Sequence, residues 1–324
     1  MYCQYTYATP QPQPGPVSFS PQRIRSGGLF SHALIRNDGH NACIRRTRMA
    51  GGLRSLLAGT ALALIHVTPA AALTWREEAR LQPLFEKAGV EGTFVVLDER
   101  NNLWRGHNRL RAEQRFSPAS TFKIPNSLIA LSLGVVANPD ELIPYKGDPN
   151  PFMREWLAPM GMRGAIKVSN VPLYQELARR IGLKRMQIAL QQLRYGNEQL
   201  GDDVTTFWLR GPLAISALEQ MQFLLGLAKR TLPFPVVAQQ QVAEITRIDG
   251  APGWSLHAKT GWQNAPGAGV GWWVGWVQQG DRITPFALNI DMKGSADAPK
   301  REQLGRRSLQ LLGVLPVDDQ RPVD

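Results

Sequence analysis

The chain has 324 residues, 43% of them hydrophobic, which is an ordinary share for a packed globular protein and allows one large domain or two small ones. Its net charge of +11 falls to +5 once the first 72 residues are left aside, because seven of the 37 basic residues and one of the 26 acidic residues lie there. The other basic residues form no Lys/Arg block and do not alternate with aromatic residues, so the composition argues against nucleic-acid binding.

Residues 1–48 are unlike the rest of the chain. They are rich in Pro and Gln and carry six arginines against one acidic residue, a composition that cannot build a core. The segment is therefore either a mis-assigned start or a disordered extension. Both cysteines, Cys3 and Cys43, fall here, so a chain without it has no thiol for a disulfide, for nucleophilic catalysis or for a metal site.

Residues 49–72 have the pattern of a signal peptide. Arg54 precedes an apolar run from Leu56 to Val67, and Ala70-Ala71-Ala72 offers small residues for cleavage. The run is about a dozen residues long, whereas a membrane span needs roughly 20, so a cleaved leader is favoured over a permanent anchor. We therefore expect a periplasmic protein, with residues 73–324 as a single folded domain and with no stable membrane span.

The predicted elements of this domain place strands towards both ends and helices in the middle. In chain order they are a helix over 77–88, a hairpin of strands 93–98 and 103–107, a helical lobe over about 120–243, a strand pair 269–277 and 283–291, and a closing helix over 298–312. The helices follow from a 3.6-residue periodicity, as in Leu173, Leu177 and Ile181. The strands follow from β-branched and aromatic runs that flank turn sequences.

Strands contributed by distant parts of one chain imply a single sheet. We predict an α/β (α+β) architecture in which a central antiparallel sheet is flanked by helices and the helical lobe is inserted between its strands. A cleft between the lobe and the sheet is the expected site.

The segment Ser120-Thr121-Phe122-Lys123 is predicted to open a helix, so Ser120 and Lys123 should share one helical face. A serine hydroxyl is a weak nucleophile until a neighbouring base takes its proton, and a helix N-terminus offers N–H groups to a developing oxyanion. The pattern alone is common, and a helix cap beside a surface lysine would also explain it.

A second segment, Lys259-Thr260-Gly261-Trp262, leads towards the apolar strand pair. Glycine lets a backbone approach a ligand closely, and lysine offers a cation to a carboxylate. On its own this pattern is weaker evidence than the first one.

Together, in this order and separated by a helical region, the two segments resemble the penicillin-recognising serine hydrolases, the group of β-lactamases and penicillin-binding proteins. Further segments resemble the class D β-lactamases within that group. These are Ser169-Asn170-Val171, Tyr195-Gly196-Asn197, Phe207-Trp208-Leu209-Arg210-Gly211, 271–276, 289–292 and Lys300-Arg301. The likeness covers residues 73–315, and it implies a β-lactamase/transpeptidase-like fold that hydrolyses a small-molecule β-lactam substrate and confers antibiotic resistance.

The resemblance implies a role for each matching residue. Ser120 would be the nucleophile, and Lys123, N-carboxylated by carbon dioxide and with no other cofactor bound, would be the general base. Trp208 would hold the carboxylated amine, and Ser169 would pass a proton to the leaving nitrogen. The backbone N–H groups of Ser120 and Trp262 would form the oxyanion hole.

The same resemblance assigns the residues around this centre. The substrate-binding set is Lys259, Thr260, Gly261, Trp262 and Arg301, in which the cations would hold a carboxylate. The expected pocket residues are Phe122, Val171, Tyr195, Asn197 and Leu209. Apolar members would lower the pKa of the Lys123 amine, and a neutral amine can add carbon dioxide. Tyr195 would shape the cleft, since an unperturbed tyrosine titrates near ~10 and keeps its proton.

Simpler explanations hold for several prominent residues. Trp272, Trp273 and Trp276 are expected in the core, and Arg301 alone could be a solvated helix residue. His257 is expected as a structural strand residue, because the Ser-Lys pair already supplies a base. The five histidines show no metal-ligand spacing, so no bound metal is predicted.

Two related functions compete with hydrolysis. A penicillin-binding transpeptidase or carboxypeptidase shares both motifs, but such enzymes usually place Asn two residues after the second serine, where this chain has Val171. A β-lactam sensor domain is similar in fold, but it follows several membrane spans and a protease domain, whereas this chain shows a single cleavable leader. The sequence indicates no particular oligomeric state.

Overall fold

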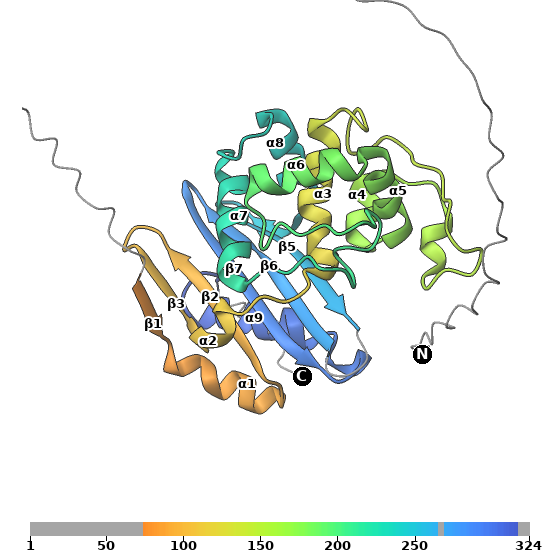
Figure 1. The fold of residues 1–324 in the computed structure, drawn as a ribbon. Helices are drawn as coiled ribbons and strands as arrows, with labels where there is room; N and C mark the ends of the chain where they lie inside the picture. The colour runs from red at the N-terminus through yellow and green to blue at the C-terminus, as the bar shows by residue number, and fades with distance from the viewer. Residues whose placement is uncertain (1–73, 265–268, 317–324) are drawn as a thin grey trace, which may run out of the picture. The chain divides into compact units, whose positions relative to one another are not determined.

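The computed structural model describes residues 74–264 and 269–316, all within one unit, Ala70–Asp324 (Figure 1). The predicted signal peptide, residues 49–72, and the segment before it, residues 1–48, lie outside the described residues. Within the described ranges no helix is both long enough and apolar enough to cross a membrane.

A seven-stranded sheet runs through the domain in the order β1-β3-β2-β7-β6-β5-β4 (Figure 1). Its strands are β1 (Thr74–Glu77), β2 (Gly92–Asp98), β3 (Leu103–His107), β4 (Arg247–Ala251), β5 (Trp254–Gln263), β6 (Gly269–Gln279) and β7 (Arg282–Met292). Strands from both ends of the chain meet where β2 pairs with β7, as the sequence predicted. Because the intervening segment forms no part of this pairing, the helical lobe is an insertion in the sheet.

The sheet departs from a purely antiparallel one at its first strand. β1 pairs in parallel with β3, while every other neighbouring pair is antiparallel. The prediction of a helix starting at Glu77 was therefore wrong at its beginning. The α-helix starts only at Gln82, where Pro83 occupies the first turn, a position in which its missing N–H and fixed φ are favourable.

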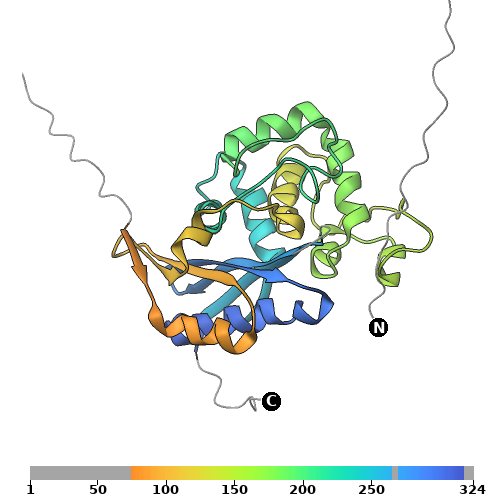
Figure 2. The ribbon, with the colours of Figure 1, turned by 60° about the horizontal axis from the view of Figure 1, so that its bottom comes forward.

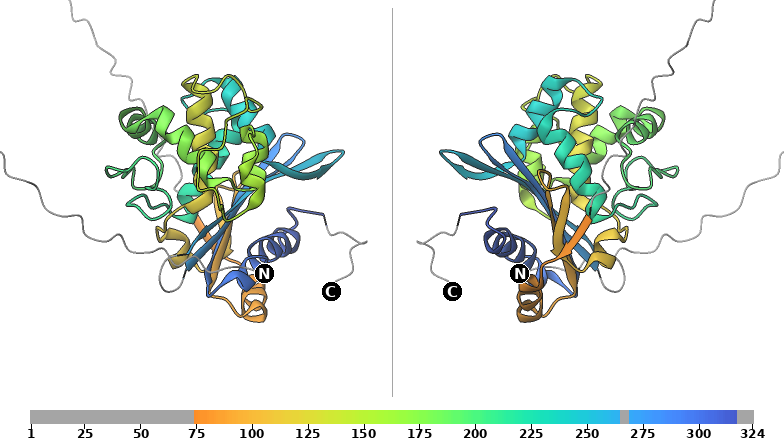
Figure 3. Two further views of the ribbon diagram at one scale, coloured as in Figure 1. Left: turned by 90° about the vertical axis from the view of Figure 1, so that its right-hand side faces the viewer. Right: turned by 90° about the vertical axis from the view of Figure 1, so that its left-hand side faces the viewer.

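Helices cover both faces of the sheet. They are α1 (Gln82–Ala88), α2 (Arg109–Glu113), α3 (Lys123–Ser132), α4 (Met162–Lys167), α5 (Val171–Ile181), α6 (Leu183–Leu193), α7 (Ala217–Lys229), α8 (Val236–Ile245) and α9 (Lys300–Leu311), with short 3-10 turns η1 (Ala79–Leu81), η2 (Ala119–Phe122), η3 (Arg154–Leu157) and η4 (Ser295–Asp297). Figures 2 and 3 show α1 and α9 against one face and the lobe of α3 to α8 against the other.

Two apolar clusters follow from this layering. The larger one fills the lobe and includes Trp272 and Trp276, while the smaller one lies under α1 and α9 and includes Trp273. Neighbouring residues of a strand point to opposite faces, so the tryptophan run of β6 serves both clusters. All three tryptophans are at most 1% exposed, which confirms their predicted place in the core.

The stripe predicted on the lobe helices is confirmed in α5. Leu173, Leu177 and Ile181 are buried, and Asn170 caps the helix by accepting from the Leu173 N–H at 3.0 Å. α5 packs against α3, the helix that follows the predicted nucleophile. The helical region therefore brings the segments around Ser120 and Ser169 to adjoining helices.

Candidate active site

Ser120 lies in a 3-10 turn, η2, and α3 begins only at Lys123. The sequence predicted one continuous helix here, and the tighter turn has a consequence for the pair. Side chains three residues apart eclipse in a 3-10 turn, so Ser120 and Lys123 are brought closer together than an α-helix requires. The Lys123 Nζ donates to Ser120 Oγ at 2.8 Å.

Lys123 is completely buried, and its pKa lies well below the usual value of lysine. The main cause is burial, which disfavours the charged amine, and the positive charge of Lys259 adds to it. The ring of Tyr174 lies 5.4 Å from the Lys123 Nζ. A neutral amine against a serine hydroxyl is an arrangement that can accept the serine proton.

Aromatic rings pack around Phe122, the residue before Lys123. Phe122 stacks on Trp208 at 5.5 Å and contacts the rings of Phe207 at 4.9 Å and Tyr195 at 5.6 Å. The Trp208 Nε1 is buried and has no hydrogen-bond partner among the described residues. A buried, unsatisfied N–H is costly unless another group accepts from it, so this donor marks a place for an acceptor.

Ser169 ends the segment between α4 and α5 in a left-handed conformation, with φ of 53°. Such a backbone is uncommon for a residue other than glycine and persists where the surroundings impose it. The neighbouring Val168 carbonyl accepts from the Trp156 indole at 3.0 Å. Ser169, Val171 and Leu209 are all partly exposed, unlike the fully buried Lys123.

Lys259, Thr260 and Gly261 lie inside β5, whereas the sequence placed them on the approach to a strand. Lys259 is 6% exposed, and its Nζ donates to the Thr260 carbonyl at 3.0 Å and to Thr260 Oγ1 at 3.2 Å. Burial and the nearby charge of Arg301 lower the pKa of Lys259 to about 7. β4 pairs with β5 only as far as His257, so the edge of β5 from Lys259 onward has no strand partner within the described ranges.

This open part of β5 touches the nucleophile turn. A Cβ built on Gly261 would lie 2.9 Å from the Pro118 carbonyl and 3.1 Å from the Thr121 methyl group, so a side chain at Gly261 would force the two segments apart. Arg301 joins the same region from α9, since its guanidinium donates to the Gly261 carbonyl at 2.6 Å. The fold therefore gathers Ser120, Lys123, Gly261 and Arg301 around one junction.

The Tyr-Gly-Asn segment is held by buried packing and by hydrogen bonds to the backbone. Tyr195 is 1% exposed, and burial raises its pKa, which keeps its proton in place. Asn197 accepts from the Ala214 N–H at 3.0 Å and donates to the Pro212 carbonyl at 2.8 Å. Its amide thereby joins the Tyr-Gly-Asn segment to the segment that follows Gly211, and its place in the pocket stays a prediction.

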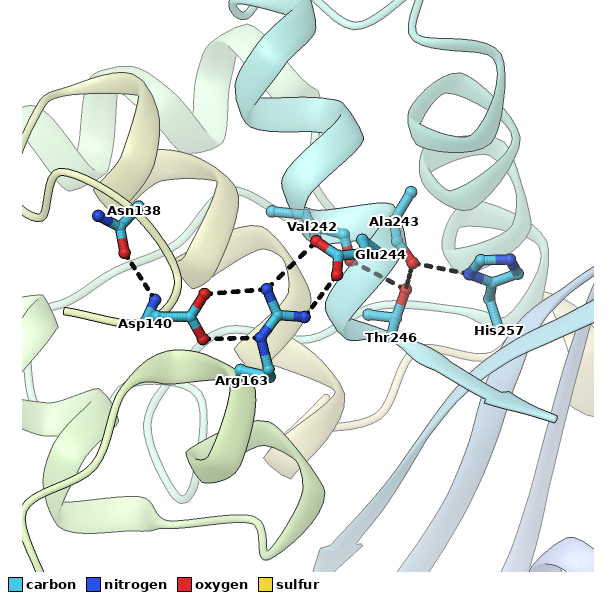
Figure 4. A network of polar contacts seen from close by, with 8 residues as sticks. All are labelled: Asn138, Asp140, Arg163, Val242, Ala243, Glu244, Thr246 and His257. Carbon is cyan, nitrogen blue, oxygen red and sulfur yellow. Dashed lines mark hydrogen bonds and ion pairs between the residues drawn. The ribbon is translucent and has the colours of Figure 1, made fainter. Parts of the chain in front are cut away.

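His257 is a structural residue of β5, as predicted. Its ring stacks on Trp276 at 4.4 Å, and its Nδ1 hydrogen-bonds the Ala243 carbonyl at 2.7 Å (Figure 4). The next residue of α8, Glu244, accepts from Arg163 at 2.6 Å, and Arg163 also binds Asp140 (Figure 4). α8 therefore joins β5 to α4, the helix that precedes Ser169.

Sequence reasoning missed four residues that hold the site together: Ser117, Thr121, Tyr174 and Gln220. A signal existed for Gln220, because it falls on the apolar stripe of its helix with Leu224 and Leu227, and a polar residue there must find a buried partner. Tyr174 carries no such signal, since an aromatic residue on an amphipathic helix is ordinarily core.

Other hollows of the surface lie away from this junction. A cavity of about 500 Å³ is lined by α1 and the ends of β2 and β7, and one of about 240 Å³ by α8, β5 and β6. Neither is lined by Ser120 or Lys123, so the chemistry and not the size of a hollow locates the site. In the described part of the chain, no group of three His, Cys, Asp or Glu residues could hold a metal ion.

Comparison with known proteins agrees with this geometry. The family model for the penicillin-binding protein transpeptidase domain matches residues 92–310. The chain is 35% identical over 246 residues to the β-lactamase OXA-5 of Pseudomonas aeruginosa, covering 75% of this chain and 90% of that protein. It is 36% identical over 248 residues to the β-lactamase OXA-48 of Klebsiella pneumoniae, covering 76% and 93% respectively.

Solved structures that resemble this one include class D β-lactamases. The crystal structure of FUS-1 (OXA-85), a class D β-lactamase of Fusobacterium nucleatum, is similar with a TM-score of 0.72 and 42% identity, covering 74% of this chain and all of that one. The class D β-lactamase YbXI of Nostoc gives 0.70 and 38%, covering 72% and 99%. The predicted fold class is thereby confirmed, and the chain belongs to the class D β-lactamases.

Proposed function

We propose that this protein hydrolyses the β-lactam ring through an acyl intermediate on Ser120, with Lys123 as the base. The observation that carries the proposal is the fully buried Lys123 amine, of lowered pKa, which donates to the Ser120 hydroxyl at 2.8 Å. Burial disfavours the charged form of the amine, and the short contact with Ser120 lets the neutral amine take the serine proton.

In the first half of the reaction the Ser120 oxygen attacks the lactam carbonyl and its proton passes to the base. The lactam C–N bond breaks, and the leaving nitrogen takes up a proton through Ser169. In the second half a water molecule attacks the acyl carbon, loses its proton to the same base and releases Ser120 with its hydroxyl restored. The N–H groups of Ser120 and Trp262 stabilise the oxyanion in both halves.

The substrate carboxylate is assigned to the cationic end of β5. Lys259 and Thr260 lie together there, and Arg301 approaches from α9 through its contact with the Gly261 carbonyl. A guanidinium suits a planar carboxylate because its N–H groups match the two oxygens. The partner implied is a small molecule with one carboxylate, in agreement with the β-lactam substrates named for the relatives.

The residues around Lys123 fit carboxylation of its amine by carbon dioxide. Only a neutral amine adds carbon dioxide, and the lowered pKa of Lys123 meets that need. The unsatisfied Nε1 of Trp208 offers the donor that an added carboxylate requires. When present, this group supplies an acid-base centre that a lysine amine alone does not provide. Phe122 would keep the surroundings apolar, and Val171 and Leu209 are proposed to do the same, so that the added carboxylate is retained.

The test is hydrolysis of a chromogenic cephalosporin by residues 73–324, with and without bicarbonate, beside the Lys123→Ala variant. Turnover that bicarbonate supports and the variant lacks is the expected result. Mass spectrometry of the variant should show little drug bound to Ser120, because acylation uses the same base as hydrolysis. Stoichiometric acylation of the unmodified protein without turnover would contradict hydrolysis and favour a penicillin-binding transpeptidase, carboxypeptidase or sensor.

We further propose that the protein acts in the periplasm after removal of residues 1–72. The support is the signal-peptide pattern of residues 49–72. N-terminal sequencing of the protein recovered from the periplasm should begin close to Leu73. A mature protein that retains Arg54 would contradict this proposal.

A further inference from the structure

Gln220 of α7 connects to the nucleophile turn through a chain of buried hydrogen bonds. It is 1% exposed, and its Nε2 donates to Thr121 Oγ1 at 2.8 Å. The Thr121 hydroxyl then donates to the Pro118 carbonyl at 2.7 Å. The chain of bonds therefore ends on the residue that caps η2, two positions before Ser120.

The far end of Gln220 is also held. Its Oε1 accepts from the Tyr195 hydroxyl at 3.3 Å, and Tyr195 keeps its proton because burial raises its pKa. α7 itself begins with a capping box between Ser216 and Glu219 and packs on β6 and β7. A side chain fixed at both ends on a capped, packed helix is a rigid support for whatever it binds.

Thr121 meets β5 on its other side. Its methyl group and the Pro118 carbonyl are the nearest atoms to a Cβ built on Gly261, at 3.1 and 2.9 Å. Gln220 therefore holds η2 where it contacts β5, the strand that continues into Trp262. The two N–H groups assigned to the oxyanion, on Ser120 and Trp262, lie on these two segments.

The turn also needs external support to hold its shape. Ala119, immediately before Ser120, has φ of 48°, which is strained for a residue with a Cβ. Support from one side comes from Ser117, whose carbonyl accepts from the Trp272 indole at 2.9 Å. Thr121 and Gln220 supply it from the other side.

We propose that Gln220 is a positioning residue for the oxyanion hole. It fixes, through Thr121, the distance between the N–H of Ser120 and the N–H of Trp262. Both donors must lie 2.7–3.1 Å from one point, as in other oxyanion holes, so a shift of less than 1 Å weakens both bonds. This inference rests on the proposed function, because it presumes attack by Ser120 on a carbonyl.

The test compares two buried glutamines on successive helices. Gln220→Leu removes the bonds to Thr121 and Tyr195. Gln239→Leu is the matched control, because Gln239 is 0% exposed on α8 and binds only the backbone of Leu232 and Phe234, away from the junction. The measurements are kcat/KM for a chromogenic cephalosporin in bicarbonate and the dissociation constant of phenylboronic acid.

The boronic acid reports the oxyanion hole without turnover. The Ser120 oxygen bonds to boron, the serine proton passes to the base, and the resulting tetrahedral anion places an oxygen in the hole. Gln220→Leu should lose roughly 10- to 100-fold in kcat/KM and in boronate affinity, in parallel, because a misplacement of about 1 Å can cost about 100-fold. Gln239→Leu, measured per folded molecule, should lose less than about threefold in either.

A second pair of variants keeps the test independent of α7. Thr121→Val removes the hydroxyl and should match Gln220→Leu, whereas Thr121→Ser retains it and should recover most of the affinity. Equal losses in the two glutamine variants, or an unchanged boronate affinity in Gln220→Leu, would overturn the inference. Unmodified protein that binds the boronate but does not turn over the cephalosporin would refute the proposed hydrolysis, while the boronate comparison would still decide the role of Gln220.

Discussion

Two lysines with almost no exposed surface meet at the active site, and their surroundings differ. Lys123 lies in the lobe, where its amine contacts the Ser120 hydroxyl and the Tyr174 ring. Lys259 lies in the sheet, where its amine donates to two oxygens of Thr260. The same side chain is thus placed once beside a nucleophile and once beside hydrogen-bond acceptors that favour its charge.

Three basic side chains, Arg301, Lys259 and Lys123, follow one another through the site, and the charged form is less favoured at each step inward. Burial, and after it the charge of Arg301, lower the pKa of Lys259 to about 7, and Lys259 in turn adds to the burial that lowers the pKa of Lys123 well below its usual value. Arginine keeps its proton at any ordinary pH. The charged form is therefore retained at Arg301, at the outer end of the row, and is disfavoured at Lys123, at the inner end, so that a carboxylate binds at one end and a proton is accepted at the other.

The largest expected effect comes from removing the inner lysine. Lys123→Met should lower kcat by roughly 10³-fold or more, because the serine proton loses its acceptor. The free energy of unfolding of the same variant, measured by urea in bicarbonate-free buffer at pH 7, should be higher by about 1 to 3 kcal/mol. The unmodified protein must deprotonate and bury an amine when it folds, and the variant need not. Lys259→Met is the control at the outer position. Activity within tenfold of the unmodified protein would contradict the assignment of Lys123 as base.

The next effect concerns the Trp208 Nε1, whose N–H has no acceptor among the described residues. Trp208→Phe should lower turnover by roughly 100-fold and raise the bicarbonate concentration needed for half-maximal activity, because an added carboxylate would lose its partner. The free energy of unfolding should fall by about 1 to 3 kcal/mol, because the smaller ring leaves a cavity in the buried cluster beside Phe122, although the Trp208 Nε1 makes no hydrogen bond to lose among the described residues. Phe207→Leu serves as the packing control. A Trp208→Phe variant that is less stable but fully active would contradict the assignment of the Trp208 N–H as the donor to the carboxylated amine.

The pH profile should separate the two lysines. As pH rises, Lys123 loses its proton and becomes competent, so kcat/KM should first increase. Lys259 loses its charge around pH 7, so carboxylate binding weakens and kcat/KM should then fall, by about tenfold up to pH 9, while Arg301 keeps part of the attraction. Lys259→Arg should remove the falling limb and leave the rising one. A profile that is flat above pH 7 in the unmodified protein would contradict this division.

Much of the fold could be predicted because its signals are local. The hairpin of β2 and β3, the pair of β6 and β7 and the stripe of α5 follow from periodicity and turn residues. β1 could not be predicted, because its four residues pair only with a strand about thirty residues away. The 3-10 turn at Ser120 was equally hidden, since Ser117 and Thr121, on either side of the strained Ala119, are bound by Trp272 and Gln220, both far away in the sequence.

The motif residues of the site could be predicted from the sequence, whereas the residues that hold them in place could not. Ser120, Lys123 and Lys259 carry recognisable patterns, because chemistry demands those residue types. The hydrogen bonds of Asn197 could not be predicted, because nothing local shows that its amide would bind the backbone of Pro212 and Ala214. Supporting residues such as Tyr174 can be exchanged for others of similar shape, so they leave no pattern in a single sequence.

The smallest effect is expected at His257, which lies two residues before Lys259 on β5. Burial lowers its pKa to about 4, so it is already neutral at pH 5 to 8 and cannot supply either limb of the pH profile. His257→Phe keeps a ring against Trp276 but loses the bond to the Ala243 carbonyl, so kcat/KM should stay within about threefold while unfolding costs about 1 kcal/mol less.

The sign of its pH dependence gives a further check on His257. Its folded pKa lies below the unfolded value of 6.5, so the unfolded chain binds more protons between pH 6.5 and about 4, and stability is lost as pH falls through that window. His257→Phe should therefore lose less stability over this range, which urea unfolding at pH 7, 5.5 and 4.5 would measure. A variant whose kcat/KM falls a hundredfold would make His257, and not only Lys123 and Lys259, part of the chemistry.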